Sequence, residues 1–262
     1  MGRFLAFLLA ALLALAPFAP AAQAGSSQAG APILPAGQVA AFADKVQADL
    51  AARGARVAIV SRMGRDPGSL PPGVRYTHVA YWVFSEIRKA DGTTGTGYRV
   101  YNLYQTEGDR ARSTLVQDSP AEFFAGAHRL DAGVVIPDAR VQAKLLRTIA
   151  SPTYRRLHNP RYAVLANPAD PRFQNCTEHT LDVLMAALYG TGDRAQIKSN
   201  IAAHFAPQPI QLGAAKRGLA GIASRALTTE DHGRRVATAT FGSIERFMRG
   251  NGLLAASYRI TP

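Results

Sequence analysis

Cys176 is the only cysteine in the chain, and it lies where the sequence predicts the start of a helix. Asn175 and Cys176 precede an apolar pattern at helical spacing, which Gly190 ends. The free N–H groups and the dipole at a helix start stabilise a thiolate, and the same donors stabilise the oxyanion of acyl transfer. The alternative is a small cysteine that only packs in the core. Because one cysteine cannot form an internal disulfide, we expect a nucleophile here.

His78 is the histidine whose position best suits a general base. It lies within residues 76–87, an apolar stretch rich in β-forming residues that predicts a strand. Packing explains an imidazole in such a strand poorly, whereas a neighbouring strand can orient it. The alternative is a hydrogen-bonded histidine of the core. The other histidines lie in predicted helices or loops: His128, His158, His179, His204 and His232.

A nucleophile and a base need a third group that orients the imidazole. The strand predicted over residues 97–105 returns beside the first strand through a hairpin loop, and Asn102 is the odd polar residue in its middle. A tight turn in that loop would place Gln105 opposite His78, so Asn102 requires a different turn or a bulge. We therefore prefer Asn102 and keep Gln105 as the second choice; an asparagine that faces water is the alternative.

Further residues are expected around this pair. Gln174 directly precedes the helix and is expected to donate to the oxyanion beside the Cys176 N–H, with Asn175 as its neighbour. Tyr76 and Trp82 are expected to line a cleft for the substrate. A metal site at Glu178, His179 and Asp182 is a weaker alternative, because zinc takes three or four ligands and no second cluster is evident. We expect no metal and no cofactor.

The elements that must position these residues alternate without regular strand–helix–strand units, which predicts the α+β class. Polar and Pro-rich or Gly-rich stretches at 62–75 and 151–172 predict long loops. Helices are predicted over residues 37–53, 121–125, 138–150, 176–189, 193–204, 213–226 and 239–249, and strands over 56–61, 76–87, 97–105, 133–136 and 255–260.

The N-terminal residues have the pattern of an export signal. Arg3 precedes a short apolar run, and a small-x-small sequence ends at Ala24, so we expect cleavage near Ala24 and a periplasmic location. Residues 25–36 then predict a flexible leader. Residues 37–262 predict one domain, with 205–262 as a helical extension.

The chain is strongly basic, with a formal net charge of +12 at pH 7. Such a charge favours peripheral contact with anionic envelope surfaces, although composition alone explains an excess of arginine. Basic residues are not interleaved with aromatic residues in a pattern typical of nucleic-acid binding, so we expect no nucleic-acid partner. The oligomeric state is not predicted.

Two motifs and their order resemble a known group of enzymes. Residues 76–80 (YTHVA) on a strand, followed later by residues 175–179 (NCTEH) at a helix start, resemble the circularly permuted NlpC/P60 papain-like group, which includes lecithin:retinol acyltransferase-like and YiiX-like proteins. The resemblance implies a permuted papain-like fold with a small antiparallel sheet. It also implies Cys176 as nucleophile, His78 as base and Asn102 as the third polar residue.

Three further segments resemble the DUF2145 family of exported bacterial proteins. These segments are residues 62–65 (RMGR), 70–78 and 101–104. The resemblance covers roughly residues 37–260. Together the residues predict a cysteine hydrolase or acyltransferase that acts on amide or ester bonds, with cell-wall peptides or lipid-like molecules as substrates. The alternative is a catalytically inactive module on the same fold that binds a cell-wall or lipid ligand.

Overall fold

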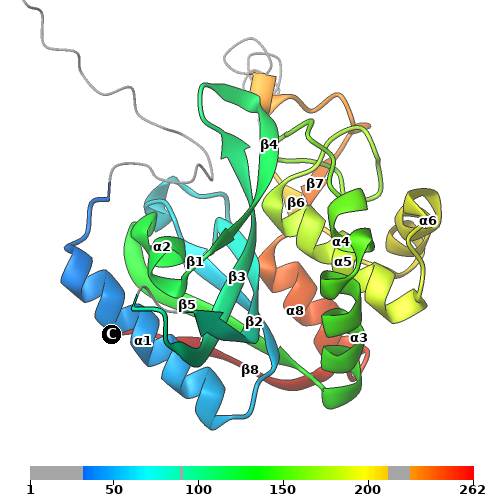
Figure 1. Ribbon diagram of the computed structural model, residues 1–262. Helices are drawn as coiled ribbons and strands as arrows, with labels where there is room; N and C mark the ends of the chain where they lie inside the picture. The colour runs from blue at the N-terminus through cyan, green and yellow to red at the C-terminus, as the bar shows by residue number, and fades with distance from the viewer. Residues whose placement is uncertain (1–31, 89–90, 212–224) are drawn as a thin grey trace, which may run out of the picture.

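The computed structural model describes residues 32–88, 91–211 and 225–262. The predicted export signal over residues 1–24, the start of the leader and nearly all of the helix predicted over 213–226 lie outside the described residues. The architecture is α+β, as the sequence predicts (Figure 1). No helix in the described part of the chain has the length and apolar character needed to cross a bilayer.

The centre of the fold is a six-stranded antiparallel sheet in the order β4-β3-β2-β1-β5-β8. β1 in the middle is buried along its whole length, and its first four residues, 57–60, form an apolar run that suits a strand covered on both faces. The six strands are β1 (Val57–Met63), β2 (His78–Arg88), β3 (Thr94–Thr106), β4 (Asp109–Asp118), β5 (Arg129–Pro137) and β8 (Leu254–Ile260).

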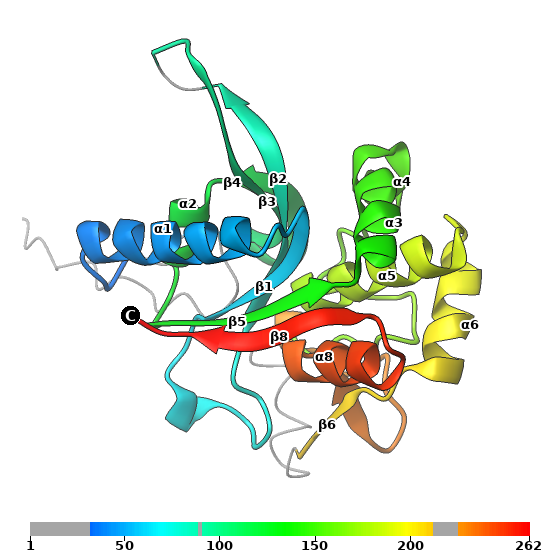
Figure 2. The ribbon, with the colours of Figure 1, turned by 90° about the horizontal axis from the view of Figure 1, so that it is seen from below.

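Helices cover both faces of this sheet (Figure 2). One face packs against α1 (Ala36–Ala52) and α2 (Pro120–Ala125), and the other packs against α3 (Ala139–Ala150), α5 (Cys176–Tyr189) and α8 (Phe241–Gly250). The remaining elements are α4 (Pro152–Arg156), α6 (Arg194–His204), the β6 (Gln208–Ile210) and β7 (Val236–Thr238) pair, and 3-10 turns at Pro67–Ser69 and Arg225–Leu227.

Successive residues of β2 serve opposite faces of the sheet. Val79 and Tyr81 pack in the core on the α5 side, whereas Ala80 and Trp82 pack in the core on the α1 and α2 side. His78 has the same parity as Ala80, so its ring lies on the α2 side of the sheet. This alternation decides which predicted site residues can meet.

Helix α5 begins and ends where the sequence predicts. The Asn175 side chain caps its start by accepting from the Glu178 N–H at 2.9 Å. Gly190 ends it in the left-handed conformation, with φ of 66°, which glycine adopts without steric cost. The first helical residue is therefore Cys176, as local capping signals predict.

Two parts of the chain differ from the prediction. The sequence did not predict β4, because an edge strand that is half exposed on both faces lacks an alternating apolar pattern. Residues 205–262 are not a helical appendage: β8 pairs with β5 as an edge of the main sheet, and α8 packs beneath it. The C-terminal segment is therefore part of the central core.

Candidate functional site

His78 is the first residue of β2, and its ring is held from three sides. Its Nε2 lies 2.8 Å from Asn102 Oδ1. The ring stacks on Tyr104 with centroids 4.8 Å apart and an interplanar angle of 8°, and Phe123 of α2 covers it at 5.5 Å. Only 1% of His78 is exposed. The imidazole therefore has one fixed orientation.

The partners of Asn102 decide the tautomer of that imidazole. Asn102 Nδ2 donates to Asp118 Oδ2 at 2.7 Å and to the Tyr104 hydroxyl at 3.0 Å. The Tyr104 hydroxyl in turn donates to Asp118 Oδ2 at 2.7 Å. Because a carboxylate accepts, the asparagine amide must face Asp118 and its oxygen must face His78. Nε2 of His78 therefore carries the hydrogen, and Nδ1 keeps a lone pair.

His78 is a neutral base in this setting. Burial, followed by the positive charge of Arg62, lowers the pKa of His78 well below its usual value, against the hydrogen bond to Asn102. Its Nδ1 is buried and has no hydrogen-bond partner among the described residues. A proton acceptor is therefore available on the side of the ring opposite Asn102.

Strands β2 and β3 separate at the end of the sheet where His78 lies. Their pairing runs from Arg88 to Tyr81 and stops there. Phe84 donates its N–H to the carbonyl of Arg56, directly before β1, so the odd-numbered residues of β2 turn their N–H groups toward β3. Beyond the last pair, the backbone N–H of Val79 lowers the pKa of the Cys176 thiol. The start of α5 thus lies next to the opened hairpin.

Cys176 is 4% exposed and packs against Leu103 and Tyr162. Burial raises the pKa of its thiol above the ordinary value, against the Val79 N–H, Thr177 and the charge of Arg62. The sequence predicted that the helix start would make the sulfur anionic, but desolvation dominates here, and the resting thiol is protonated. A base must remove its proton before it can attack a carbonyl.

Cys176 and His78 both line a pocket of about 280 Å³. Arg62, Tyr76 and Asn175 also contribute to its walls. No hydrogen bond joins Cys176 Sγ to His78 Nδ1; the nearest polar side-chain partner of the sulfur is Thr177 Oγ1 at 3.8 Å. The structure therefore brings the thiol and the imidazole to one pocket without a hydrogen bond between them.

Tyr76 and Asn175 have fixed positions in this pocket. The Tyr76 hydroxyl donates to Asp131 at 3.0 Å, and its ring packs edge-on against Phe241. Asn175 Nδ2 donates to Val164 O at 3.0 Å while its oxygen caps α5. Both residues shape the wall next to Cys176.

Three other predicted residues, Trp82, Gln105 and Gln174, have different roles. Trp82 is fully buried on the α1 and α2 side of the sheet and does not reach the pocket. Gln105 donates to Arg110 O at 2.8 Å within its own hairpin, so Asn102 alone orients His78. Asn102 reaches it without a bulge because the hairpin pairs Tyr81 with Tyr101, one position from the expected register.

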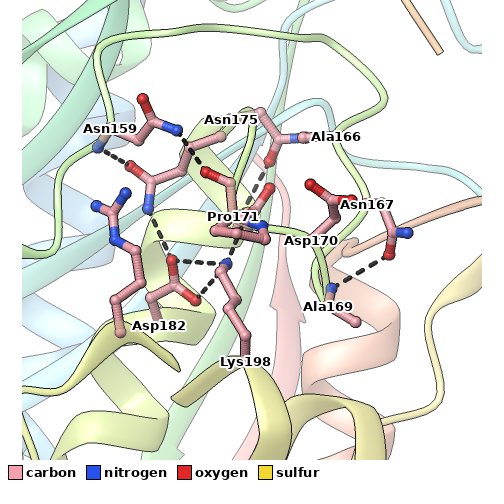
Figure 3. Close-up of polar contacts among 12 residues, drawn as sticks. Asn159, Ala166, Asn167, Ala169, Asp170, Pro171, Asn175, Asp182 and Lys198 are labelled. Atoms are coloured by element: carbon pink, nitrogen blue, oxygen red, sulfur yellow. Dashed lines mark hydrogen bonds and ion pairs between the residues drawn. The ribbon is translucent and has the colours of Figure 1, made fainter. Parts of the chain in front are cut away.

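Gln174 does not point at the thiol. Its oxygen accepts from the Asn159 N–H at 2.8 Å, and its amide donates to Leu157 O at 3.0 Å and to Asp182 Oδ2 at 2.7 Å. Two of its partners, Asn159 and Asp182, are drawn in the polar cluster of Figure 3. With its donors occupied, Gln174 positions the loop before α5 and supplies no oxyanion contact.

The acidic residues of α5 form ion pairs with Lys198. The Lys198 Nζ lies 2.6 Å from Glu178 Oε1 and 2.8 Å from Asp182 Oδ1, and Figure 3 shows Lys198 directed at Asp182. His179 points elsewhere, with Nε2 3.3 Å from Tyr154 O. The described residues contain no group of three or more His, Cys, Asp or Glu side chains arranged to hold a metal ion. The arrangement fixes α5 against α6.

Four site residues were missed from the sequence. Arg62 falls in a stretch that the sequence predicts as a loop, but it lies in β1 and pairs with His78 of β2. Tyr104 lies two positions after Asn102 on the same strand face, a signal that could have been used. Asp118 and Phe123 lie on elements that no local pattern connects to His78. They are found only through the strand order and the packing of α2.

The chain is an α+β protein with a neutral, oriented histidine and a buried thiol in one pocket. A family sequence model described as "Uncharacterized protein conserved in bacteria (DUF2145)" matches residues 49–248. The chain belongs to this family. No curated protein and no solved structure matched the chain.

Proposed function

We propose that this protein is a cysteine hydrolase or acyltransferase that acts on amide or ester bonds. The observation that carries the proposal is His78 Nδ1, a buried lone pair without a partner in the pocket that also contains the Cys176 thiol. Asn102 and Asp118 fix the tautomer that makes Nδ1 the acceptor. A histidine that only stabilised the core would direct both ring nitrogens at partners.

The reaction follows from these positions. His78 Nδ1 takes the thiol proton as the sulfur attacks the carbonyl carbon, and a tetrahedral oxyanion forms. The carbon–nitrogen or carbon–oxygen bond then breaks, and the leaving amine or alcohol takes the proton from His78. Water, or an acceptor alcohol or amine, attacks the thioester with His78 again as base. Cys176 regains its proton, and the acid or the transferred acyl product leaves.

The backbone start of α5 is the donor group for the oxyanion. The Cys176 N–H lies in the first turn, where no intrahelical acceptor exists, and the Asn175 side chain caps the later Glu178 N–H instead. The oxyanion then replaces water at a helix start, where the dipole favours negative charge. This role does not require Gln174.

The permuted papain-like fold is part of this proposal. The order of the site residues supports it, because the strand with His78 precedes the helix that begins at Cys176. The packing of α5 on an antiparallel sheet is compatible with the same fold. The export signal that the sequence predicts supports a periplasmic location, where cell-wall peptides and lipid-like molecules are the substrates we propose. A basic surface attracts such acidic peptides.

A ligand-binding module on the same fold is the second candidate. The protonated thiol and the missing Sγ–Nδ1 hydrogen bond favour it. In that case the pocket would bind a cell-wall or lipid-like ligand without covalent chemistry.

Acylation of Cys176 separates the two candidates. The folded protein is mixed with p-nitrophenyl acetate, and the nitrophenol burst and the mass of the acylated protein are followed. An enzyme acylates Cys176 faster than the urea-unfolded chain at the same pH, and His78→Ala slows acylation about 100-fold. His204→Ala, an exposed histidine on α6, is the matched control. Equal rates for folded, unfolded and His78→Ala protein would leave only the binding module.

A further inference from the structure

Arg62 brings a charge into the interior without a direct ion pair, although the charge of Asp118 acts on it from a longer distance. It is 3% exposed. Its Nη1 donates to Phe123 O, and its guanidinium lies over the rings of Tyr104 and Phe123 at 5.7 and 5.2 Å. No carboxylate of the described residues forms an ion pair with it, and its Nε has no hydrogen-bond partner. Aromatic faces and one carbonyl offset the loss of water only in part.

The carboxylate of Asp118 interacts with Arg62 through its charge but forms no direct ion pair with it. Asp118 Oδ2 accepts from Asn102 and from the Tyr104 hydroxyl. Burial of a guanidinium without a direct ion pair is unfavourable, so its retention beside the thiol calls for a function. An arginine donates in a planar fork that matches a carboxylate.

Arg62 lies at the wall of the pocket, against two glycines. Arg62, Gly64 and Gly126 line it together with Cys176 and His78. A Cβ at Gly126 would lie 2.7 Å from Arg62 Nη2, and a Cβ at Gly64 would lie 4.0 Å from Arg62 Nε. A side chain at Gly126 would therefore displace the guanidinium, and one at Gly64 would narrow the approach to its free Nε.

We propose that Arg62 binds a carboxylate of the substrate and thereby selects acidic peptides, in which a carboxylate lies close to the scissile amide. This inference rests on the proposed function and names its substrate class. The anion would pair with the free side of the guanidinium, while the carbonyl carbon lies at Cys176 Sγ. A peptide with an uncharged amide in place of that carboxylate would leave Arg62 unpaired and bind more weakly.

Binding is tested in a Cys176→Ala protein, so that no covalent step is needed. Isothermal titration compares N-acetyl-glutamate N-methylamide with N-acetyl-glutamine N-methylamide, which differ by one charge and have nearly the same shape. We expect the acid to bind at least about tenfold more tightly. Arg62→Gln removes that difference, Arg62→Lys keeps part of it, and Arg140→Gln, an exposed arginine on α3, leaves it unchanged.

Gly126→Ala provides a second test that keeps the arginine but displaces its guanidinium. We expect this variant to lose part of the preference for the acidic ligand. Circular dichroism of each variant shows that the fold persists. Equal binding of both ligands to the Cys176→Ala protein would overturn the proposal. So would a preference that Arg65→Gln abolishes and Arg62→Gln keeps, since Arg65 also lines the pocket.

Alkylation of Cys176 tests whether Arg62 attracts a carboxylate next to the sulfur. Iodoacetate carries a carboxylate and iodoacetamide does not, so we compare the ratio of their alkylation rates. The ratio cancels any change in thiol pKa, because both reagents need the same thiolate. We expect a ratio above that of the unfolded chain, and Arg62→Gln lowers it to that value. If the alkylation ratio is no higher than in the unfolded chain while p-nitrophenyl acetate still acylates the protein rapidly, the role of Arg62 is wrong but the proposed enzyme stands. If acylation is absent while the protein still prefers the acidic ligand, the proposed enzyme is wrong but the role of Arg62 stands.

Discussion

The backbone N–H of Val79 lowers the pKa of the Cys176 thiol at the point where strand β3 no longer pairs with β2. Val79 directly follows His78, so the start of α5 and the start of β2 lie next to each other. The separation of β2 from β3 leaves this end of β2 free to face α5. The opened end of the hairpin is thus the place where a helix start and an imidazole share a pocket.

Asn102→Ala is expected to slow the acylation of Cys176 by about 10-fold to 100-fold. Without the asparagine oxygen, His78 no longer holds its hydrogen on Nε2, and the free lone pair on Nδ1 is lost in part of the population. The burst rate with p-nitrophenyl acetate measures the loss. The ¹⁵N chemical shifts of His78 report the tautomer, a readout that a purely structural role would leave unchanged.

Asn251→Ala, at the exposed end of α8, is the matched control for this variant. It is expected to keep both the burst rate and the His78 shifts. If Asn102→Ala retains the wild-type tautomer and rate, Asn102 does not position the base.

The local parts of this fold were predictable from the sequence. Asn175 and Gly190 mark the ends of α5 through capping and a left-handed glycine, which act within a few residues. The central hairpin was predictable from its β-forming residues, so the positions of Cys176, His78 and Asn102 on their elements followed. These three residues need only the correct element and face.

The nonlocal parts of the site were not predictable. Arg62 meets His78 only through the pairing of β1 with β2, and Asp118 meets Asn102 only through an edge strand without an apolar pattern. Gln174 has the right place in the chain for an oxyanion donor, but Asn159 and Asp182 occupy its amide. The direction of the thiol pKa depends on the depth of burial, which spacing does not indicate.

The free energy of unfolding is expected to fall as the pH falls below about 6.5, the usual histidine pKa. Burial lowers the pKa of His179 to about 3, so between these values the unfolded chain binds a proton that the folded chain does not. The unfolded state is then favoured by about 1.4 kcal/mol per pH unit. The loss levels off once the folded histidine also protonates.

Urea unfolding at pH 7 and pH 5 measures this effect. His179→Gln removes the titration and is expected to reduce the stability difference between the two pH values by about 2 kcal/mol. His204→Ala serves as an exposed control that leaves the difference unchanged. An undiminished difference in His179→Gln would assign the acid sensitivity to other groups.

Lys198→Met is expected to destabilise the protein by about 3–5 kcal/mol. The substitution leaves Glu178 and Asp182 buried beneath the site without a cation. Their carboxylates must then protonate or admit water, so the loss grows as the pH rises. Chemical denaturation at pH 5 and pH 8 measures both the size and the direction of this effect.

Lys45→Met is the matched control for Lys198→Met, because Lys45 is exposed and donates only to Thr261 O. Its effect is expected to stay below about 1 kcal/mol. Adding Glu178→Gln and Asp182→Asn to Lys198→Met restores part of the lost stability. If the single substitution costs no more than the control, the cluster does not hold α5 against α6.

The thiol of Cys176 is expected to titrate above the range of free cysteine, about 8.5. Burial raises its pKa, while the charge of Arg62 and the Val79 N–H oppose the rise. The rate of alkylation by iodoacetamide between pH 6 and 10.5 gives the midpoint, because only the thiolate reacts. Arg62→Gln removes a positive charge and moves the midpoint further up, whereas Arg140→Gln does not move it. A midpoint below about 7 in the wild-type protein would instead mean that the thiolate already forms at rest, and His78 would then act first as an acid rather than as a base.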